Sequence, residues 1–155
     1  MADELTLTST LNKAFVPVTS TQQLVYALID VKPNEVISQS RMSLNFGFVL
    51  DHSGSMRGAK IDRLKDAVAL ALSKMAPDDL VSVTIFSDSA EVIAGSGPLA
   101  DKRGNLNNKV QRIRAGGGTQ MSRGLSLGLR EVYRQFAAER VNQVLLLTDG
   151  QTYGD

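Results

Sequence analysis

The amino-acid sequence predicts an α/β fold, with a doubly wound, mainly parallel sheet that follows an antiparallel β segment. Apolar runs typical of buried parallel strands occur at residues 44–51, 80–86 and 141–148. Helical patterns at 58–75 and 121–138 alternate with these runs. Strands that alternate with helices form a parallel sheet with helices packed on its faces. With 155 residues, the chain is long enough for one domain with a sizeable core.

Residues 1–42 differ in pattern from the rest and are expected to form a separate β segment. Residues 5–10, Leu-Thr-Leu-Thr-Ser-Thr, begin with alternating apolar and hydroxyl side chains, and residues 23–31 read as a strong strand that ends at Lys32-Pro33-Asn34. Two or three antiparallel strands are therefore predicted here. The expected division is a β-strand segment over 1–42 and an α/β domain over 43–155.

The two long helical patterns each carry an apolar stripe at spacings of three and four residues, which predicts the face that packs on the sheet. Between them, residues 90–94 are expected to pair as a hairpin with the strand at 80–86, and a short helix is expected at 107–113. The stripe of the first helix is Ile61, Leu64, Val68, Ala71 and Met75, and that of the second is Met121, Leu125, Leu129, Val132 and Phe136.

The stretch Asp51-His52-Ser53-Gly54-Ser55 is the most informative for function. It places a carboxylate and two hydroxyls at alternate positions on the loop that leaves the carboxyl end of a strand. Open α/β sheets bind ligands at that edge. A set of oxygen ligands without sulfur or imidazole suits Mg²⁺, Mn²⁺ or Ca²⁺ rather than zinc.

Two further pieces of sequence fit the same arrangement. Gly116-Gly-Gly-Thr119 precedes the second long helix, and the apolar run before Asp149-Gly150 ends on a carboxylate. Taken with the first stretch, these residues resemble the von Willebrand factor type A (VWA) domain and its metal-ion-dependent adhesion site, or MIDAS. The resemblance covers roughly Leu44 to Asp155. The positions that match the family pattern are Asp51, Ser53, Ser55, Thr119 and Asp149.

The resemblance implies a function in protein binding. In the family pattern, the hydroxyls and carboxylates hold Mg²⁺, with Mn²⁺ or Ca²⁺ as alternatives, and an Asp or Glu carboxylate of a partner protein completes the coordination. The β segment before the VWA core is similar to bacterial VWA proteins in which a small β-sandwich packs against the α/β domain. A family core has two further strand–helix pairs after the strand that ends at Asp149. We therefore expect the remainder to be supplied by another chain, by self-association or by a part absent from this sequence.

Each residue of the motif also has an ordinary structural interpretation. Ser53, Ser55 and Thr119 could cap the helices that follow them, and Asp149-Gly150 could form a simple turn. His52 is the only histidine and, by alternation along the chain, is expected to point away from the ion. The remaining charged residues near the motif are expected to be solvated; they are Asp78, Asp79, Asp88, Lys60, Arg63 and Lys65.

Composition narrows the range of functions. The net charge is +1, so neither nucleic acid nor an anionic membrane is an expected partner. The chain has no cysteine, which excludes disulfides and thiolate chemistry. The first residues show no signal peptide and no apolar run is long enough to span a membrane, so a cytoplasmic location is expected.

Two functions compete with a metal-dependent binding module. A Mg²⁺-dependent hydrolase or phosphotransferase on a similar sheet would need a nucleophile or base beside the ion, and none is visible next to Asp51. A VWA subunit of an ATPase-containing assembly is the other, and only a purification partner would distinguish it. We expect a binding module and no enzymatic activity.

Overall fold

The computed structural model describes residues 5–15, 18, 23–33 and 41–152. The chain divides into two compact units, Met1–Arg41 and Met42–Asp155, and each is described by itself. No helix in the described part of the chain is long and apolar enough to cross a membrane.

The first unit contains a two-stranded antiparallel sheet. Strand β1 (Leu5–Leu11) pairs with β2 (Ala27–Pro33), in a register that runs from Leu5↔Pro33 to Leu11↔Ala27. The prediction that the second strand spans 23–31 was wrong at both ends. Asn12 is the reason at its start: its side-chain oxygen accepts a hydrogen bond from Tyr26 N at 2.9 Å, and its own N–H donates to Tyr26 O, which ends the ladder.

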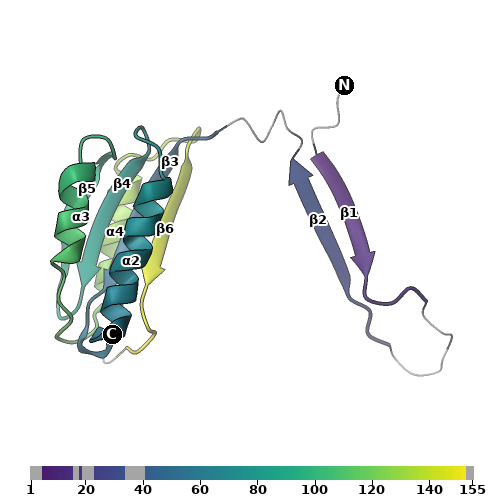
Figure 1. The fold of residues 1–155 in the computed structure, drawn as a ribbon, viewed down its shortest axis with the longest axis horizontal. Helices are drawn as coiled ribbons and strands as arrows, with labels where there is room; N and C mark the ends of the chain where they lie inside the picture. The colour runs from purple at the N-terminus through teal and green to yellow at the C-terminus, as the bar shows by residue number, and fades with distance from the viewer. Residues whose placement is uncertain (1–4, 16–17, 19–22, 34–40, 153–155) are drawn as a thin grey trace. The chain divides into compact units, whose positions relative to one another are not determined.

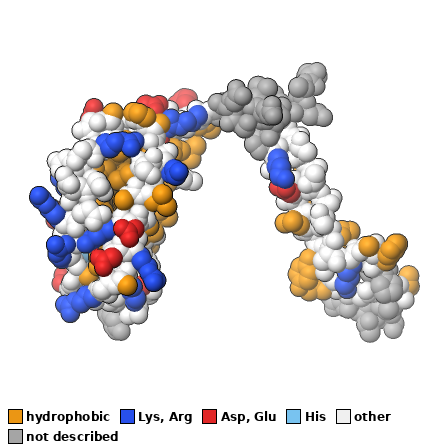
Figure 2. Space-filling model, in the orientation of Figure 1, with side chains coloured by type: hydrophobic (Ala, Val, Ile, Leu, Met, Phe, Trp, Pro, Cys, Tyr) orange, Lys and Arg blue, Asp and Glu red, His pale blue; other side chains and the backbone are white. Residues whose placement is uncertain are grey.

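Apolar side chains of this two-stranded sheet are exposed rather than packed in a core. Leu7 is 66% exposed and Ile29 is 62% exposed. Figure 2 shows hydrophobic side chains at the surface of this unit. Two strands without a covering layer are marginally stable in water. The exposed apolar side chains of this sheet therefore indicate a surface that another layer of protein would have to cover for the sheet to be stable.

The second unit is built on a four-stranded sheet in the order β5-β4-β3-β6 (Figure 1). Strands β3 (Leu44–Asp51), β4 (Leu80–Phe86) and β6 (Val141–Leu147) are parallel, and β5 (Ala90–Pro98) is antiparallel to β4. The predicted α/β fold with a mainly parallel, doubly wound sheet is confirmed. In this order β6 lies at the sheet edge, with Leu145 38% exposed.

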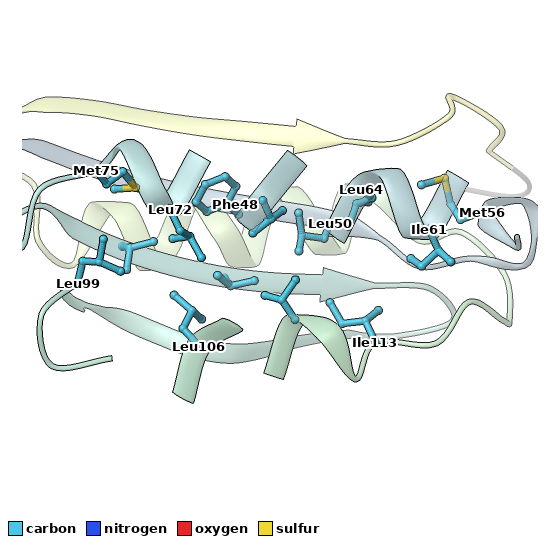
Figure 3. Packing of buried hydrophobic residues seen from close by; sticks show 14 residues of the cluster. Phe48, Leu50, Met56, Ile61, Leu64, Leu72, Met75, Leu99, Leu106 and Ile113 are labelled. Atoms are coloured by element: carbon cyan, nitrogen blue, oxygen red, sulfur yellow. The ribbon is translucent and has the colours of Figure 1, made fainter. Parts of the chain in front are cut away.

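One face of the sheet carries the apolar core. Phe48 and Leu50 of β3 pack with side chains of α2 (Ala59–Lys74) and α3 (Arg103–Gln111), as Figure 3 shows. The predicted stripe of the first long helix lies in or against this core, with Ala71 partly buried. Because alternate strand residues face opposite sides, Gly47 and Val49 face the other layer.

That other layer is α4 (Met121–Tyr133), which approaches the sheet through glycines. A Cβ on Gly124 would lie 2.5 Å from Phe86 Cδ1, and a Cβ on Gly47 would lie 2.6 Å from Val132 Cγ2. Since real side chains do not approach so closely, the absence of a side chain at these positions lets helix and strands come together.

The predicted apolar stripe of this second helix is confirmed only in part: Val132 is buried, and Met121 and Leu125 are half-buried. The sheet-facing residues are Gly124, Gly128, Glu131 and Val132, whereas Leu129 is 51% and Phe136 is 60% exposed. Glu131 is buried because its carboxylate accepts a hydrogen bond from Ser96 N of β5 at 3.0 Å and pairs with Arg134 at 2.7 Å.

Several element boundaries also differ from the predictions. Helix α4 ends at Tyr133 rather than at 138, because Gln135 N and Phe136 N bond to carbonyls only three residues back, which tightens and ends the last turn. Helix α3 begins at Arg103 rather than 107; its only buried residues are Leu106 and Val110, so its apolar signal is weak. Strand β5 continues past residue 94 to Pro98 through register shifts against β4.

Two charges that were expected to be solvated are buried. Asp79 is 0% exposed, and its carboxylate accepts hydrogen bonds from Leu44 N at 2.9 Å and Ala76 N at 2.8 Å. It therefore ties the start of β3 to the turn that leads into β4. Lys65 on α2 is only 7% exposed.

Candidate metal centre

Four of the five residues predicted as ligands, all but Thr119, lie at the carboxyl ends of β3 and β6, which are neighbouring parallel strands. Asp51 is the last residue of β3 and is fully buried. Its Oδ1 accepts a hydrogen bond from Ser53 N at 2.8 Å, and its Oδ2 accepts one from Thr148 Oγ1 at 2.7 Å. Both carboxylate oxygens are thereby held in place.

Thr148 is a residue that the sequence reasoning did not identify. Besides donating to Asp51, its hydroxyl accepts a hydrogen bond from Gly150 N at 3.0 Å. Thr148 thus links the first carboxylate of the site to the loop that carries the second, Asp149. Its position directly before Asp149 was the only signal in the sequence.

A chain of oxygen atoms connects three of the other predicted ligands. Ser53 Oγ lies 3.0 Å from Ser55 Oγ, and Ser55 Oγ donates to Asp149 Oδ1 at 3.2 Å. Ser53 is only 1% exposed. The structure therefore brings Asp51, Ser53 and Ser55 together with Asp149, which lies 94 residues after Ser55 in the sequence.

The alternative interpretation of these hydroxyls as helix caps is contradicted by the caps themselves. Ser53 precedes the short 3-10 helix η1 (Gly54–Met56), but its side chain makes no capping hydrogen bond. The residue at the N-cap of α2 is Gly58, whose φ of 74° favours glycine, and the N-cap of α4 is Gln120 rather than Thr119.

Thr119 belongs to a loop that is bonded to the first motif through the backbone. Gly116 N donates to His52 O at 2.8 Å, and Gly54 N donates to Gly117 O at 2.9 Å. Thr119 itself is 4% exposed. In the described part of the chain, the hydrogen bonds that connect the other four predicted ligands do not include the Thr119 hydroxyl.

Asp88 holds the same loop from the other side. Its Oδ1 accepts a hydrogen bond from Gly118 N at 2.6 Å, so it is not only the solvated loop charge that was expected. Gly117 has a φ of 82° and lies so close to the Asp88 carboxylate that a side chain on Gly117 would overlap it. The glycines before Thr119 therefore permit both the turn and this contact.

The two basic neighbours of the site differ in their partners. His52 Nδ1 lies 3.1 Å from the carbonyl oxygen of Arg114. Lys60, predicted to be solvated, instead places its Nζ 2.6 Å from Asp149 Oδ2. The hydrogen bond from Lys60 is the main cause that lowers the pKa of Asp149, and further hydrogen bonds from Gln151 N and Ser55 act in the same direction.

The oxygens of the Ser53–Ser55–Asp149 chain lie at hydrogen-bond distance from each other, at 3.0 and 3.2 Å. Among the described residues no group of three or more His, Cys, Asp or Glu side chains could hold a metal, so hydroxyls must contribute to any such site.

The fold and the position of these residues define an α/β domain with a cluster of hydroxyl and carboxylate oxygens at the carboxyl edge of its sheet. Residues 46–151 match the von Willebrand factor type A domain family, and the chain belongs to that family. The family generally mediates protein–protein interactions.

Two relatives agree with this assignment. An uncharacterized protein of Synechocystis sp. is 34% identical over 116 residues, which cover 74% of this chain and 27% of the relative. The inter alpha-trypsin inhibitor heavy chain 4 of Mus musculus is 37% identical over 117 residues, which cover 70% of this chain and 12% of the relative. This chain thus spans about a quarter or less of the length of these relatives.

Two solved structures share the fold at low sequence identity. The PilB minor pilin from Streptococcus sanguinis aligns with a TM-score of 0.62 and 20% identity, over 94% of this chain and 46% of that chain. A von Willebrand factor type A protein from Catenulispora acidiphila aligns with a TM-score of 0.57 and 19% identity, over 83% of this chain and 30% of that chain.

Proposed function

We propose that this chain is a divalent-metal-dependent protein-binding module. Mg²⁺ is the proposed ion, and the ligands are Asp51, Ser53, Ser55, Thr119 and Asp149, directly or through water. An Asp or Glu side chain of a partner protein completes the coordination. The observation that carries the proposal is the oxygen chain Ser53–Ser55–Asp149, which lies beside the buried carboxylate of Asp51.

The ligand types explain why the ion would attract a partner. Serine and threonine hydroxyls are neutral, so they bind the ion without cancelling its charge. Mg²⁺ prefers octahedral oxygen coordination and retains water where the protein supplies no ligand. An incoming carboxylate that replaces such a water gains a charge-assisted contact, which makes binding dependent on an acidic residue of the partner.

A Mg²⁺-dependent hydrolase or phosphotransferase is less well supported. That chemistry requires a general base or nucleophile placed beside the ion. In the described part of the chain, the imidazole of His52 contacts Arg114 O, and the Lys60 amine is bonded to Asp149. We therefore propose binding without catalysis.

Calorimetric titration with Mg²⁺ and Mn²⁺ tests the metal site. We expect saturable binding by the wild-type chain and none by the Ser53→Ala/Ser55→Ala double variant. Ser73→Ala is the matched control, because the Ser73 hydroxyl is exposed on α2 and bonds only to Leu70 O at 2.7 Å. Equal binding by the double variant and the wild type would place the ion elsewhere and refute the assignment.

Affinity capture from native extract tests the partner. A partner that is retained in Mg²⁺, released by EDTA and absent with the double variant would support the proposal. Substitution of its acidic residues by their amides should abolish retention. Capture that is insensitive to both EDTA and the double substitution would contradict metal-dependent binding.

A further inference from the structure

The two carboxylate oxygens of Asp149 have different partners. Lys60 lies in the first turn of α2, and its Nζ contacts Asp149 Oδ2 at 2.6 Å. The other oxygen, Oδ1, accepts the Ser55 hydroxyl and so belongs to the oxygen chain of the candidate metal centre. The Asp149 side chain is 12% exposed and that of Lys60 is 48% exposed, so this ion pair is partly exposed beside the candidate metal centre.

We propose that Lys60 is a specificity-determining residue. By offsetting the charge of Asp149, it lowers the affinity of the protein for the metal ion and makes the bound ion more attractive to a carboxylate of a partner. The inference rests on the proposed function, because it concerns the same site. It adds a reason why the bound ion remains attractive to an external carboxylate.

The effect of Lys60 follows from the charges at the candidate metal centre. Asp51 and Asp149 together match the charge of one divalent cation, and with these two groups alone a loaded site would be close to neutral. The Lys60 ammonium, in direct contact with Asp149, leaves the loaded site with a net positive charge. Charges within a few ångströms of each other interact strongly at a partly buried site, so this remaining charge favours an incoming carboxylate.

The other cations on the same segment do not have this position. Arg57 and Arg63 are exposed and form no ion pair with another described residue. Lys60 is thus the cation whose removal changes the charge at the site itself. Arg63 on α2 provides a control for a general change of net charge.

The contact between Lys60 and Asp149 could instead have a structural role, and the two roles predict opposite effects of removing Lys60 on metal affinity. If Lys60 served only to fix the Asp149 side chain, its removal would loosen a ligand and weaken metal binding. If Lys60 competes electrostatically with the ion, its removal strengthens metal binding and reduces the benefit from a carboxylate.

The experiment measures the Mg²⁺ dissociation constant by calorimetry, with and without acetate as the carboxylate probe. We expect Lys60→Met to bind Mg²⁺ about tenfold more tightly than the wild type, which is the scale of one modest charge interaction. The ratio of the constants without and with acetate should be smaller in Lys60→Met than in the wild type. Arg63→Met should leave both quantities unchanged, and the Ser53→Ala/Ser55→Ala variant corrects for acetate bound to Mg²⁺ in solution.

Each outcome decides between the inference and the proposed function. Wild-type binding that depends on the two serines, together with unchanged or weaker binding by Lys60→Met, would overturn the inference alone. Binding that appears only in Lys60→Met would overturn both, because the wild-type chain would then hold no ion for a partner to complete. No binding by either protein would overturn both. Lys60→Gln serves as a second variant, and circular dichroism verifies that each protein is folded.

Discussion

Gly128 of α4 packs directly against the side chain of Val49 on β3, so closely that a methyl group on Gly128 would overlap Val49 Cγ2. We predict that Gly128→Ala destabilises the chain by about 1–3 kcal/mol, the usual cost of overpacking a core that cannot relax. Urea denaturation followed by circular dichroism measures the change.

Gly104 on α3 is the matched control, because a Cβ at this position would meet no atom within 4 Å. Gly104→Ala should stabilise the chain by about 0.4–1 kcal/mol, since alanine restricts the unfolded chain and fits a helix. Equal effects of the two substitutions on the free energy of unfolding would show that the space between α4 and β3 can accommodate a methyl group.

This contact also shows where sequence patterns fail. Apolar periodicity predicted the positions of β3, β4 and α2, because each of them buries large apolar side chains. It could not predict the buried face of α4, where glycines make the contact and Leu129 faces solvent. Apolar periodicity is recognised from large side chains, so it gives no signal where a helix packs closely through glycines.

The candidate site was likewise predictable from the sequence only in part. Chain order and strand ends were enough to predict that Asp51 and Asp149 lie at one edge, because β3 and β6 are parallel neighbours. The supporting contacts of Thr148, Asp88 and Lys60 were not predictable, since each depends on side-chain distances between segments far apart in sequence.

The carboxylate of Asp79 should be essential for stability rather than for binding. Asp79→Ala leaves the N–H groups of Leu44 and Ala76 without their acceptor, and an unsatisfied buried donor costs about 1–3 kcal/mol. Asp79→Asn retains one acceptor oxygen and should lose less. Asp66→Asn, on the exposed face of α2, is the control. The denaturation midpoint should be lowest for Asp79→Ala, higher for Asp79→Asn and highest for the control. An Asp79→Ala variant as stable as the control would refute this role.

Asp88 should affect metal affinity through the loop that carries Thr119. Asp88→Ala removes the acceptor of Gly118 N, so we expect weaker Mn²⁺ binding with little loss of overall stability. Asp88→Asn keeps an acceptor oxygen at that position and should restore most of the affinity. Electron paramagnetic resonance of free Mn²⁺ measures the constants. If the two variants bind equally weakly, the charge of Asp88 matters instead of its hydrogen bond.

Lys102 should titrate at a lower pH in the folded chain than in the unfolded chain. Burial is the main cause that lowers the pKa of Lys102, and Lys109 acts in the same direction, against the opposing charges of Glu131 and Asp101. The folded protein therefore binds fewer protons between the two pKa values, and stability should rise with pH through that window.

The pH dependence of Lys102 acylation, read by mass spectrometry in buffer and in urea, provides the measurement. Lys102→Met should remove the alkaline rise in stability. In the folded chain the Lys102 amine also donates hydrogen bonds to Gly95 O and Val81 O. Identical acylation midpoints in buffer and in urea would contradict the predicted shift.

The outer edge of β6 should promote association of the 155-residue chain. β6 pairs with β3 on one side, and no other described strand pairs with its opposite edge, where Leu145 is 38% exposed. Exposed apolar edge strands pair readily with other chains. Analytical ultracentrifugation should show concentration-dependent association, unless another chain covers this edge. Leu145→Lys should reduce it more than Gln143→Lys, which adds the same charge at another exposed position of β6 without removing an apolar group. A monomer at all concentrations that unfolds cooperatively would show that this edge is stable without a partner.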